Sequence, residues 1–217
     1  MTPASHVVWD WNGTLLDDFD LTARIAEQTL AQLGSPGITG THVREHFTRP
    51  FSTFYSRLLG RSVTDEELDF IRQRYEIEYS AEVLDVSLSP DAAAALDMVE
   101  AQATQSLLSM APDVHLQALI DHHGIRTRFL RVEGSPTDSS DGNKAGRLRD
   151  HLASLGVDAQ GTVLIGDTVD DGEAAAACDA GAVLVTTGSQ ARPPLEATGF
   201  PVVDTLLEAA TIAVGDR

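Results

Sequence analysis

Short apolar runs without polar alternation recur along the chain, and each one ends near a turn or a polar residue. They cover residues 6–10, 104–109, 128–132, 162–166 and 182–185. A strand buried on both faces has this pattern, because helices cover both sides of a parallel sheet. The runs therefore predict five strands of a parallel sheet.

Segments with helical spacing lie between the later runs. Apolar residues fall on one face of a helix that starts at Pro112, and on one face of a second helix over residues 148–155. Strands that alternate with helices of this length form βαβ units. The pattern thus indicates an α/β fold with a doubly wound, Rossmann-like parallel sheet.

The stretch between the first two runs breaks this alternation. It contains helical patterns only, over residues 21–33, 42–47, 51–59 and 64–79, with glycine and proline at the breaks. An all-helical block at this place is typical of a lid inserted into an α/β domain. The sequence therefore predicts a core of residues 1–17 and 88–217, with a helical cap of residues 18–87.

The charge of the chain narrows the choice of partners. The 15 Lys and Arg residues stand against 33 Asp and Glu residues, for a formal net charge of −18. Nucleic acid and anionic lipid surfaces carry the same sign of charge as the chain, so neither is an expected partner.

The single Cys178 excludes an intrachain disulfide. Without an apolar run of 18 residues or a basic leader, we expect a cytoplasmic protein, either a monomer or a homodimer.

Several polar residues are expected at one edge of the sheet. Asp10 ends the first run, Ser109 ends the second, and Asp167 and Asp171 follow the fourth. Ligands of open α/β sheets bind outside the carboxyl ends of the strands. Lys144, the only lysine of the chain, begins a helix between the third and fourth runs. Carboxylate oxygens suit Mg²⁺, a carboxylate can accept a phosphoryl group, and a lysine can neutralise phosphoryl oxygens.

These residues resemble the four ordered motifs of the haloacid dehalogenase superfamily. The motifs are the segment 10–16 with the sequence DWNGTLL, Ser109, Lys144, and the segment 166–171 with the sequence GDTVDD. The first and fourth are specific, whereas the serine and the lysine gain weight from their order and spacing. The helical insert is similar to a C1 cap, and the branch resembled is the phosphoglycolate phosphatase-like one.

The resemblance implies a role for each site residue. Asp10 would be the nucleophile, and Ser109, with Ser106 as the fallback, would hold the phosphoryl group together with Lys144. Mg²⁺ would be held by Asp10, the backbone carbonyl of Asn12, Asp167, and Asp171 or Asp170. The expected substrate-binding residues are Gly13, Thr14, Met110 and, in the cap, Arg49.

Asn12 departs from the family pattern. Phosphatases of the family carry a second Asp two positions after the nucleophile, which protonates the leaving oxygen and later activates water. General acid–base help of this kind is worth about 10²–10⁴-fold in rate. Asn12 leaves three interpretations: a leaving group that needs no proton, a substitute acid at Asp17 or Asp18, or a weak or lost activity. We expect Asn12→Asp to raise the turnover of alkyl phosphates.

The predicted function is that of a Mg²⁺-dependent phosphatase of a small phosphorylated metabolite, acting through an aspartyl-phosphate on Asp10. An acyl phosphate is an alternative substrate because its leaving group needs no proton. A phosphonatase would use a cap lysine, which this cap lacks, and a haloacid dehalogenase would not need the acidic loop at Asp167. A non-catalytic module that binds a phosphorylated metabolite is the rival of another class, motivated by Asn12.

Overall fold

The computed structural model describes residues 2–136 and 144–215. Its centre is a six-stranded parallel sheet in the order β3-β2-β1-β4-β5-β6. The chain leaves β1 toward β2 on one side and later returns to β4 on the other, which places a topological switch point at the end of β1. The strands are β1 (His6–Trp9), β2 (Thr104–Pro112), β3 (Val132–Ser135), β4 (Thr162–Gly166), β5 (Gly181–Val185) and β6 (Val202–Val203).

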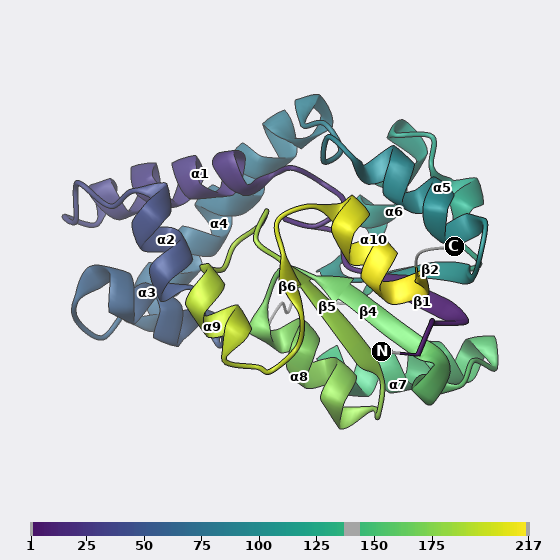
Figure 1. The fold of residues 1–217 in the computed structure, drawn as a ribbon. Helices are drawn as coiled ribbons and strands as arrows, with labels where there is room; N and C mark the ends of the chain where they lie inside the picture. The colour runs from purple at the N-terminus through teal and green to yellow at the C-terminus, as the bar shows by residue number, and fades with distance from the viewer. Residues whose placement is uncertain (1, 137–143, 216–217) are drawn as a thin grey trace.

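Helices cover both faces of this sheet (Figure 1). One apolar cluster joins Val7 and Trp9 of β1 to the helices α5, α6 and α10, and a second joins Val8 to α7 and α8. Neighbouring residues of β1 thus point to opposite faces of the sheet, and both faces are buried under helices. The bounds are α5 (Ala92–Glu100), α6 (Asp113–His122), α7 (Lys144–Leu155), α8 (Val169–Ala177), α9 (Arg192–Glu196) and α10 (Leu206–Val214).

Four helices between β1 and β2 form the helical insert, which lies to one side of the sheet in Figure 1. They are α1 (Phe19–Gln32), α2 (Gly40–His46), α3 (Phe51–Leu59) and α4 (Asp65–Glu82). The insert has an apolar cluster of its own, in which Leu30, Val43 and Ile71 join α1, α2 and α4. No helix in the described part of the chain is long and apolar enough to cross a membrane.

Four of the predicted strands lie where the apolar runs place them, but the third does not. The predicted run 128–132 is mostly a 3₁₀ turn (Arg126–Arg128) and irregular chain, and Leu130 is 61 % exposed. The strand begins instead at Val132, pairs with Leu107 and forms the edge of the sheet. An edge strand tolerates half-exposed polar residues such as Glu133, so it has no continuous apolar run. The two-residue strand β6 was not predicted.

A chain of buried polar groups crosses the sheet away from the aspartates. The Ser106 hydroxyl oxygen lies 2.8 Å from the Nε2 atoms of both His6 and His151. His151 continues through Nδ1 to Glu133 at 2.9 Å, and His6 continues to Thr104 at 2.8 Å. Ser106, the fallback phosphoryl ligand, is therefore committed to this network and is fully buried.

The network makes the stability of the fold sensitive to acid. Burial, followed by the charge of His151, lowers the pKa of His6 from 6.5 to about 4. Between these values the unfolded chain binds a proton that the native protein does not, so we expect stability to fall as the pH drops through this range. The expected loss is about 3 kcal/mol. Urea unfolding of the wild type and of His6→Gln between pH 7.5 and pH 4 measures it.

His115, an exposed residue of α6, offers the matched control for this titration. His115→Gln should keep the pH dependence of the wild type, whereas His6→Gln should reduce it. The part that remains belongs to His151, because burial lowers the pKa of His151 as well. Equal pH dependence in the wild type and in His6→Gln would show that His6 does not carry the effect.

Candidate active site

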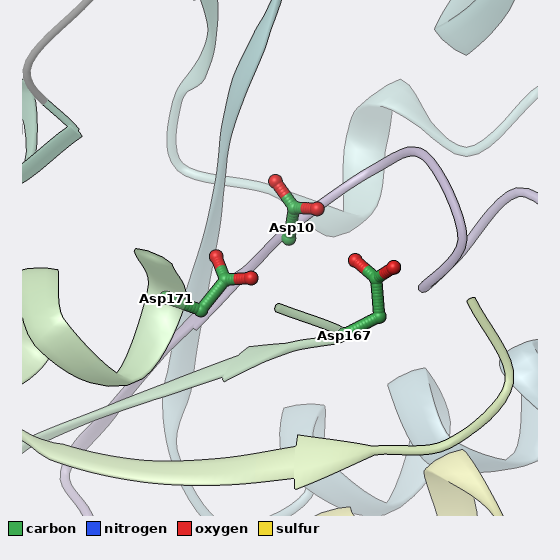
Figure 2. A group of neighbouring side chains, drawn as sticks. All are labelled: Asp10, Asp167 and Asp171. Atoms are coloured by element: carbon green, nitrogen blue, oxygen red, sulfur yellow. The ribbon is translucent and has the colours of Figure 1, made fainter. Parts of the chain in front are cut away.

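Three aspartates from separate segments meet at the switch point of the sheet. Asp10 directly follows β1, Asp167 directly follows β4, and Asp171 lies in the first turn of α8. One carboxylate oxygen of each lies within 4.8 Å of the others, and all three residues are buried. Figure 2 shows the carboxylates turned toward a common space.

Lys144 is the cation of this group. Its Nζ lies 2.6 Å from Asp10 Oδ1 and also contacts Asp171 Oδ1. Burial would lower the pKa of Lys144, but the charges of Asp10 and then Asp171 outweigh it and hold the pKa above its ordinary value. The sole lysine of the chain is therefore a buried, charged partner of the aspartates.

One ammonium does not neutralise three carboxylates. Burial raises the pKa of Asp10 to about 6, although the Lys144 ammonium opposes the shift. Burial and then the charge of Asp10 raise the pKa of Asp167 well above its usual range. The surplus negative charge and the hard oxygen donors fit a divalent cation, which would relieve this repulsion. Asp10, Asp167 and Asp171 are the residues that would hold it.

The local sequence explains why Asp171 rather than Asp170 faces this space. Thr168 caps the N-terminus of α8, and its backbone N–H and hydroxyl both donate to Asp171 Oδ2, at 3.0 and 2.5 Å. This capping box fixes the Asp171 side chain at the helix start and leaves Oδ1 to face Lys144. Asp170, one residue earlier, points elsewhere and pairs with Arg49 of the helical insert at 2.8 Å.

Two glycines leave room for the Asp167 side chain, and the loop after β5 donates a hydrogen bond to it. Gly13 has a φ of +70°, and a Cβ there would lie 2.6 Å from Asp167 Oδ2. A Cβ at Gly188 would also overlap the Asp167 side chain. The Ser189 N–H donates to Asp167 Oδ2 at 2.6 Å, and Thr14 Oγ1 donates to Oδ1 at 3.4 Å. The loop after β5 is thus part of the site, although the sequence analysis did not single out its residues.

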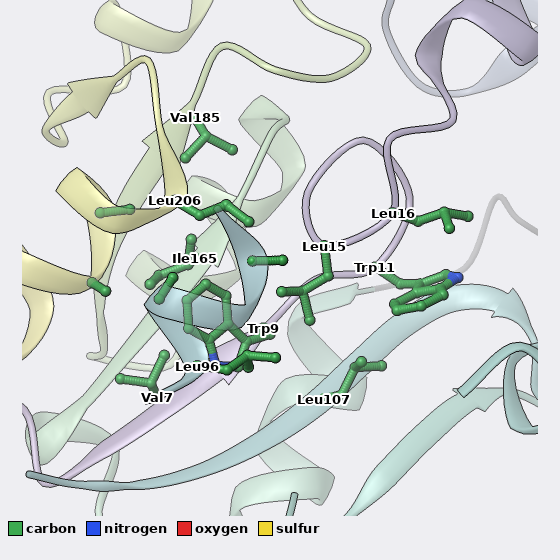
Figure 3. Packing of buried hydrophobic residues seen from close by; sticks show 14 of the residues in the cluster. Val7, Trp9, Trp11, Leu15, Leu16, Leu96, Leu107, Ile165, Val185 and Leu206 are labelled. Atoms are coloured by element: carbon green, nitrogen blue, oxygen red, sulfur yellow. The ribbon is translucent and has the colours of Figure 1, made fainter. Parts of the chain in front are cut away.

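Apolar side chains anchor the loop that follows Asp10. Trp11, Leu15 and Leu16 are fully buried, and they pack in the core with Leu107 and other residues shown in Figure 3. The backbone N–H groups of Thr14 and Leu16 both donate to the Trp11 carbonyl, at 3.2 and 2.9 Å. The loop is therefore a rigid extension of β1 and not a free linker.

Ser109 and Met110 end the buried part of β2. Ser109 Oγ accepts a hydrogen bond from the Ala111 N–H at 3.0 Å, and the Ser109 carbonyl accepts one from Arg147 Nη1 at 2.9 Å. The same Arg147 nitrogen lies 3.8 Å from Met110 Sδ. Arg147 lies one helical turn after Lys144. The same face of α7 therefore carries the Lys144 ammonium and contacts the end of β2 through Arg147. No pattern in the sequence connects Arg147 with the site.

Asn12 is joined to two residues that surround it. Its Nδ2 lies 2.7 Å from Asp18 Oδ2 and 2.7 Å from the hydroxyl of Tyr79 in α4. Asp18 is 2 % exposed, whereas Asp17 is exposed and has no side-chain hydrogen bond to Asn12. Of the two candidate acids near Asn12, only Asp18 contacts it. Tyr79 has no signal in the sequence that connects it with the site.

The helical insert also contacts the site through its second helix and the loop after it. Arg44 donates to the carbonyls of Gly188 and Thr187, at 2.9 and 3.2 Å. Gln190 accepts from the Val169 N–H at 2.6 Å and donates to the Phe47 carbonyl at 3.2 Å. The loop after β5 therefore touches both the insert and the first turn of α8, next to the aspartates.

Comparison with known proteins places this site in a family. The model of the haloacid dehalogenase-like hydrolases matches residues 7–176, and a second, HAD-hydrolase-like model matches residues 144–209. The chain belongs to the haloacid dehalogenase-like hydrolases. The aspartates, Lys144 and Ser109 of this hydrolase all lie within the first match. No curated protein matches the chain.

Solved structures confirm the fold of this hydrolase. A haloacid dehalogenase-like family protein from Streptococcus pneumoniae is 19 % identical with a TM-score of 0.81, and covers 98 % of this chain and 99 % of its own. A predicted phosphoglycolate phosphatase from Haemophilus somnus is 17 % identical with a TM-score of 0.75, covering 98 % and 99 %. A HAD family hydrolase from Deinococcus radiodurans, with bound phosphate and sodium, is 18 % identical with a TM-score of 0.72, covering 98 % and 97 %.

Proposed function

We propose that this hydrolase is a Mg²⁺-dependent phosphatase of a small phosphorylated metabolite. The observation that carries the proposal is the buried group of Asp10, Asp167 and Asp171 with Lys144 on Asp10. A neighbour of the same fold binds phosphate, and anionic phosphate suits a site that combines a lysine with a divalent cation. The likeness to a predicted phosphoglycolate phosphatase supports the same substrate class.

Asp10 is the proposed nucleophile. One of its carboxylate oxygens attacks phosphorus, the bond from phosphorus to the leaving oxygen breaks, and the electron pair leaves with that oxygen. Water then attacks the phosphorus of the aspartyl-phosphate, which releases phosphate and restores the carboxylate. The water gives up one proton to bulk solvent in this second step, and the departed leaving oxygen takes up a proton from solvent when it is basic enough to need one.

The other residues bind and orient. Lys144 and Ser109 hold phosphoryl oxygens, and Gly13, Thr14 and Met110 line the phosphate-binding positions. Mg²⁺, when bound, neutralises charge on the phosphoryl oxygens. It would be held by Asp10, Asp167, Asp171 and the Asn12 backbone carbonyl. Asp170 serves the insert through Arg49 in this scheme and not the metal.

We also propose that the helical insert acts as a cap, with residues 18–87 as the cap and residues 1–17 and 88–217 as the core. The insert has its own apolar cluster, and its contacts with the site pass through Arg44, Arg49 and Tyr79. A cap that rests on the carboxyl ends of the strands would exclude water during phosphoryl transfer.

Asn12 supports acyl or aryl phosphates as the substrates turned over fastest, because an amide does not protonate a leaving oxygen. The same residue favours a second candidate, a phosphometabolite-binding protein without turnover. Phosphate release from acetyl phosphate, 4-nitrophenyl phosphate and glycolate phosphate, with Mg²⁺ or with a chelator, tests both. Turnover that needs Mg²⁺ supports the phosphatase. Binding of inorganic phosphate without turnover of any compound supports the second candidate.

Arg49→Ala should weaken substrate binding more than the chemical step. Arg49 pairs with Asp170 and lies over the Phe51 ring, at 4.7 Å from its centroid. A residue of the insert faces the part of the substrate away from the transferred group, so its loss removes uniform binding. We expect KM for a metabolite with an anionic group to rise by roughly tenfold, and KM for 4-nitrophenyl phosphate to change little.

Arg72→Ala is the matched control for this change, because Arg72 is an exposed arginine of α4 that pairs, among the described residues, only with Asp69. It should leave both KM values unchanged. If Arg49→Ala raises both KM values equally, Arg49 shapes the loop and does not select the substrate.

A further inference from the structure

We propose that Asp18 and Tyr79 are positioning residues that fix the Asn12 carboxamide in one orientation. Residue 12 then presents only an acceptor oxygen to the site, which orients the attacking water by accepting a hydrogen bond from it. The proposal rests on the proposed function for this catalytic role, whereas the locked amide itself is a property of the fold. Neither Asp18 nor Tyr79 touches the reacting atoms in this account.

Both hydrogens of the Asn12 amide nitrogen have partners. Nδ2 donates to Asp18 Oδ2 and to the Tyr79 hydroxyl oxygen, each at 2.7 Å. The Tyr79 hydroxyl in turn donates to Asp18 Oδ2 at 2.8 Å, so Asn12, Asp18 and Tyr79 form a closed triangle of hydrogen bonds. A carboxylate has no hydrogen to donate, so the atom of Asn12 that faces Asp18 must be the nitrogen.

Asp18 depends on these donors. Its second oxygen, Oδ1, accepts the Gly13 N–H at 2.7 Å, and its side chain is buried. No described residue forms an ion pair with Asp18. A buried carboxylate without a cation is stabilised only by its hydrogen bonds, so the loss of one is costly. This cost holds the amide of Asn12 in place.

The Asn12 oxygen is the free end of the amide. No described residue donates a hydrogen bond to Oδ1, and Asn12 is half-buried. Within the described part of the chain this oxygen is left to accept from water or a ligand, whereas the nitrogen has both of its partners. Rotation of the amide by half a turn would bring Oδ1 against the Asp18 carboxylate and the acceptor side of Tyr79, so the free oxygen cannot exchange places with the nitrogen.

This triangle of hydrogen bonds also joins the loop after β1 to the helical insert. Asn12 belongs to the loop after β1, Asp18 lies at the start of α1, and Tyr79 lies near the end of α4. The ring of Tyr79 stacks on Tyr75, with centroids 5.0 Å apart and planes 15° apart. The position of the insert thus determines whether Asn12 has both of its partners.

The arrangement changes what Asn12→Asp should do. A carboxylate at residue 12 would face the Asp18 carboxylate at the distance of a hydrogen bond. The two groups must then repel each other or take up a proton, and either outcome costs stability relative to the wild type. The reversed pair, Asn12→Asp with Asp18→Asn, restores all four contacts. Residue 18 accepts from the Gly13 N–H and donates to residue 12 and to the Tyr79 hydroxyl oxygen, and Tyr79 donates to residue 12. The number of charges stays the same.

A double-mutant cycle of urea unfolding tests whether Asp18 and Tyr79 fix the Asn12 amide, an arrangement that we call the lock. It needs no assay of turnover. The proteins are the wild type, Asn12→Asp, Asp18→Asn and the reversed pair, all in chelator. Each single change should raise the unfolding equilibrium constant by roughly 10- to 100-fold. The reversed pair should lie within about fivefold of the wild type. Asp20→Asn, which removes an exposed charge from the first turn of α1, should have no effect beyond about twofold.

The second measurement concerns catalysis. Tyr79→Phe should lower kcat for 4-nitrophenyl phosphate by roughly three- to tenfold at unchanged KM, because the amide loses one partner. Tyr75→Phe removes a hydroxyl one helical turn away and should leave kcat unchanged. The reversed pair should raise the ratio of alkyl to aryl phosphate turnover, whereas Asn12→Asp alone should raise it less.

The two measurements separate the two claims. If the effects of Asn12→Asp and Asp18→Asn on unfolding simply add, the lock does not exist, whatever the enzyme does. If they compensate but the wild type turns over no phosphate, the lock stands and the proposed function fails. If they compensate and Tyr79→Phe matches Tyr75→Phe in kcat, the catalytic role of the lock is wrong.

Discussion

Asp10→Asn should lower kcat for any phosphate substrate by about 10⁴-fold or more, because the amide cannot attack phosphorus. The side chain keeps its size, so the loop after β1 keeps its buried anchors. Phosphate release at saturating Mg²⁺ measures the change. Lost activity could come from a lost nucleophile or from lost metal binding. Calorimetry of Mg²⁺ binding to the same variant separates the two causes.

The stability of Asp10→Asn provides its control. Burial raises the pKa of Asp10 to about 6, so the charged carboxylate is unfavourable in the fold at neutral pH without a metal. Its removal should leave the urea midpoint in chelator unchanged or higher. An inactive variant with a normal midpoint and measurable Mg²⁺ binding meets the expectation. Turnover within about tenfold of the wild type would rule out the covalent mechanism.

Lys144→Ala should have the second largest effect, on both rate and stability. Without Lys144 the carboxylates of Asp10 and Asp171 lose their close cation. Loss of one preorganised charge at the transferred group lowers kcat by about 10²–10³-fold. Removal of one partner from a buried ion pair costs about 3–5 kcal/mol, and this loss should show in the free energy of unfolding in chelator.

Lys144→Arg separates charge from geometry, because a guanidinium keeps the charge but not the compact ammonium. It should recover much of the stability and only part of the rate. Added Mg²⁺ should also restore part of the stability of Lys144→Ala, since the metal supplies the missing positive charge. Unchanged stability and unchanged kcat/KM in Lys144→Ala would show that Lys144 is an ordinary helix residue.

The buried strands could be predicted because their apolar runs are continuous. Residues 162–166 coincide with β4, and the runs at 6–10, 104–109 and 182–185 lie on β1, β2 and β5. The edge strand β3 escaped this criterion since one side of it is half-exposed, and β6 is too short to form a pattern. The helices of the insert were predicted within a few residues because their apolar faces pack on one another.

The parts of the site that follow strands could also be predicted. Asp10 and Asp167 come directly after buried runs, so topology alone brings them together. The choice between Asp170 and Asp171 could not be made, because it depends on the capping box with Thr168. Asp18 entered only as one of two candidates. Tyr79 lies 67 residues from Asn12 in sequence, and contacts between an insert and a core leave no local pattern.

The most direct test of the account is the mass of the trapped enzyme. The protein is mixed with acetyl phosphate and Mg²⁺, quenched in acid within one turnover, digested and analysed by mass spectrometry. The covalent mechanism predicts one phosphoryl group on the peptide that contains Asp10, with none in Asp10→Asn or in chelator. A phosphoryl group on any other residue, or steady turnover with no phosphorylated peptide at any quench time, would contradict it.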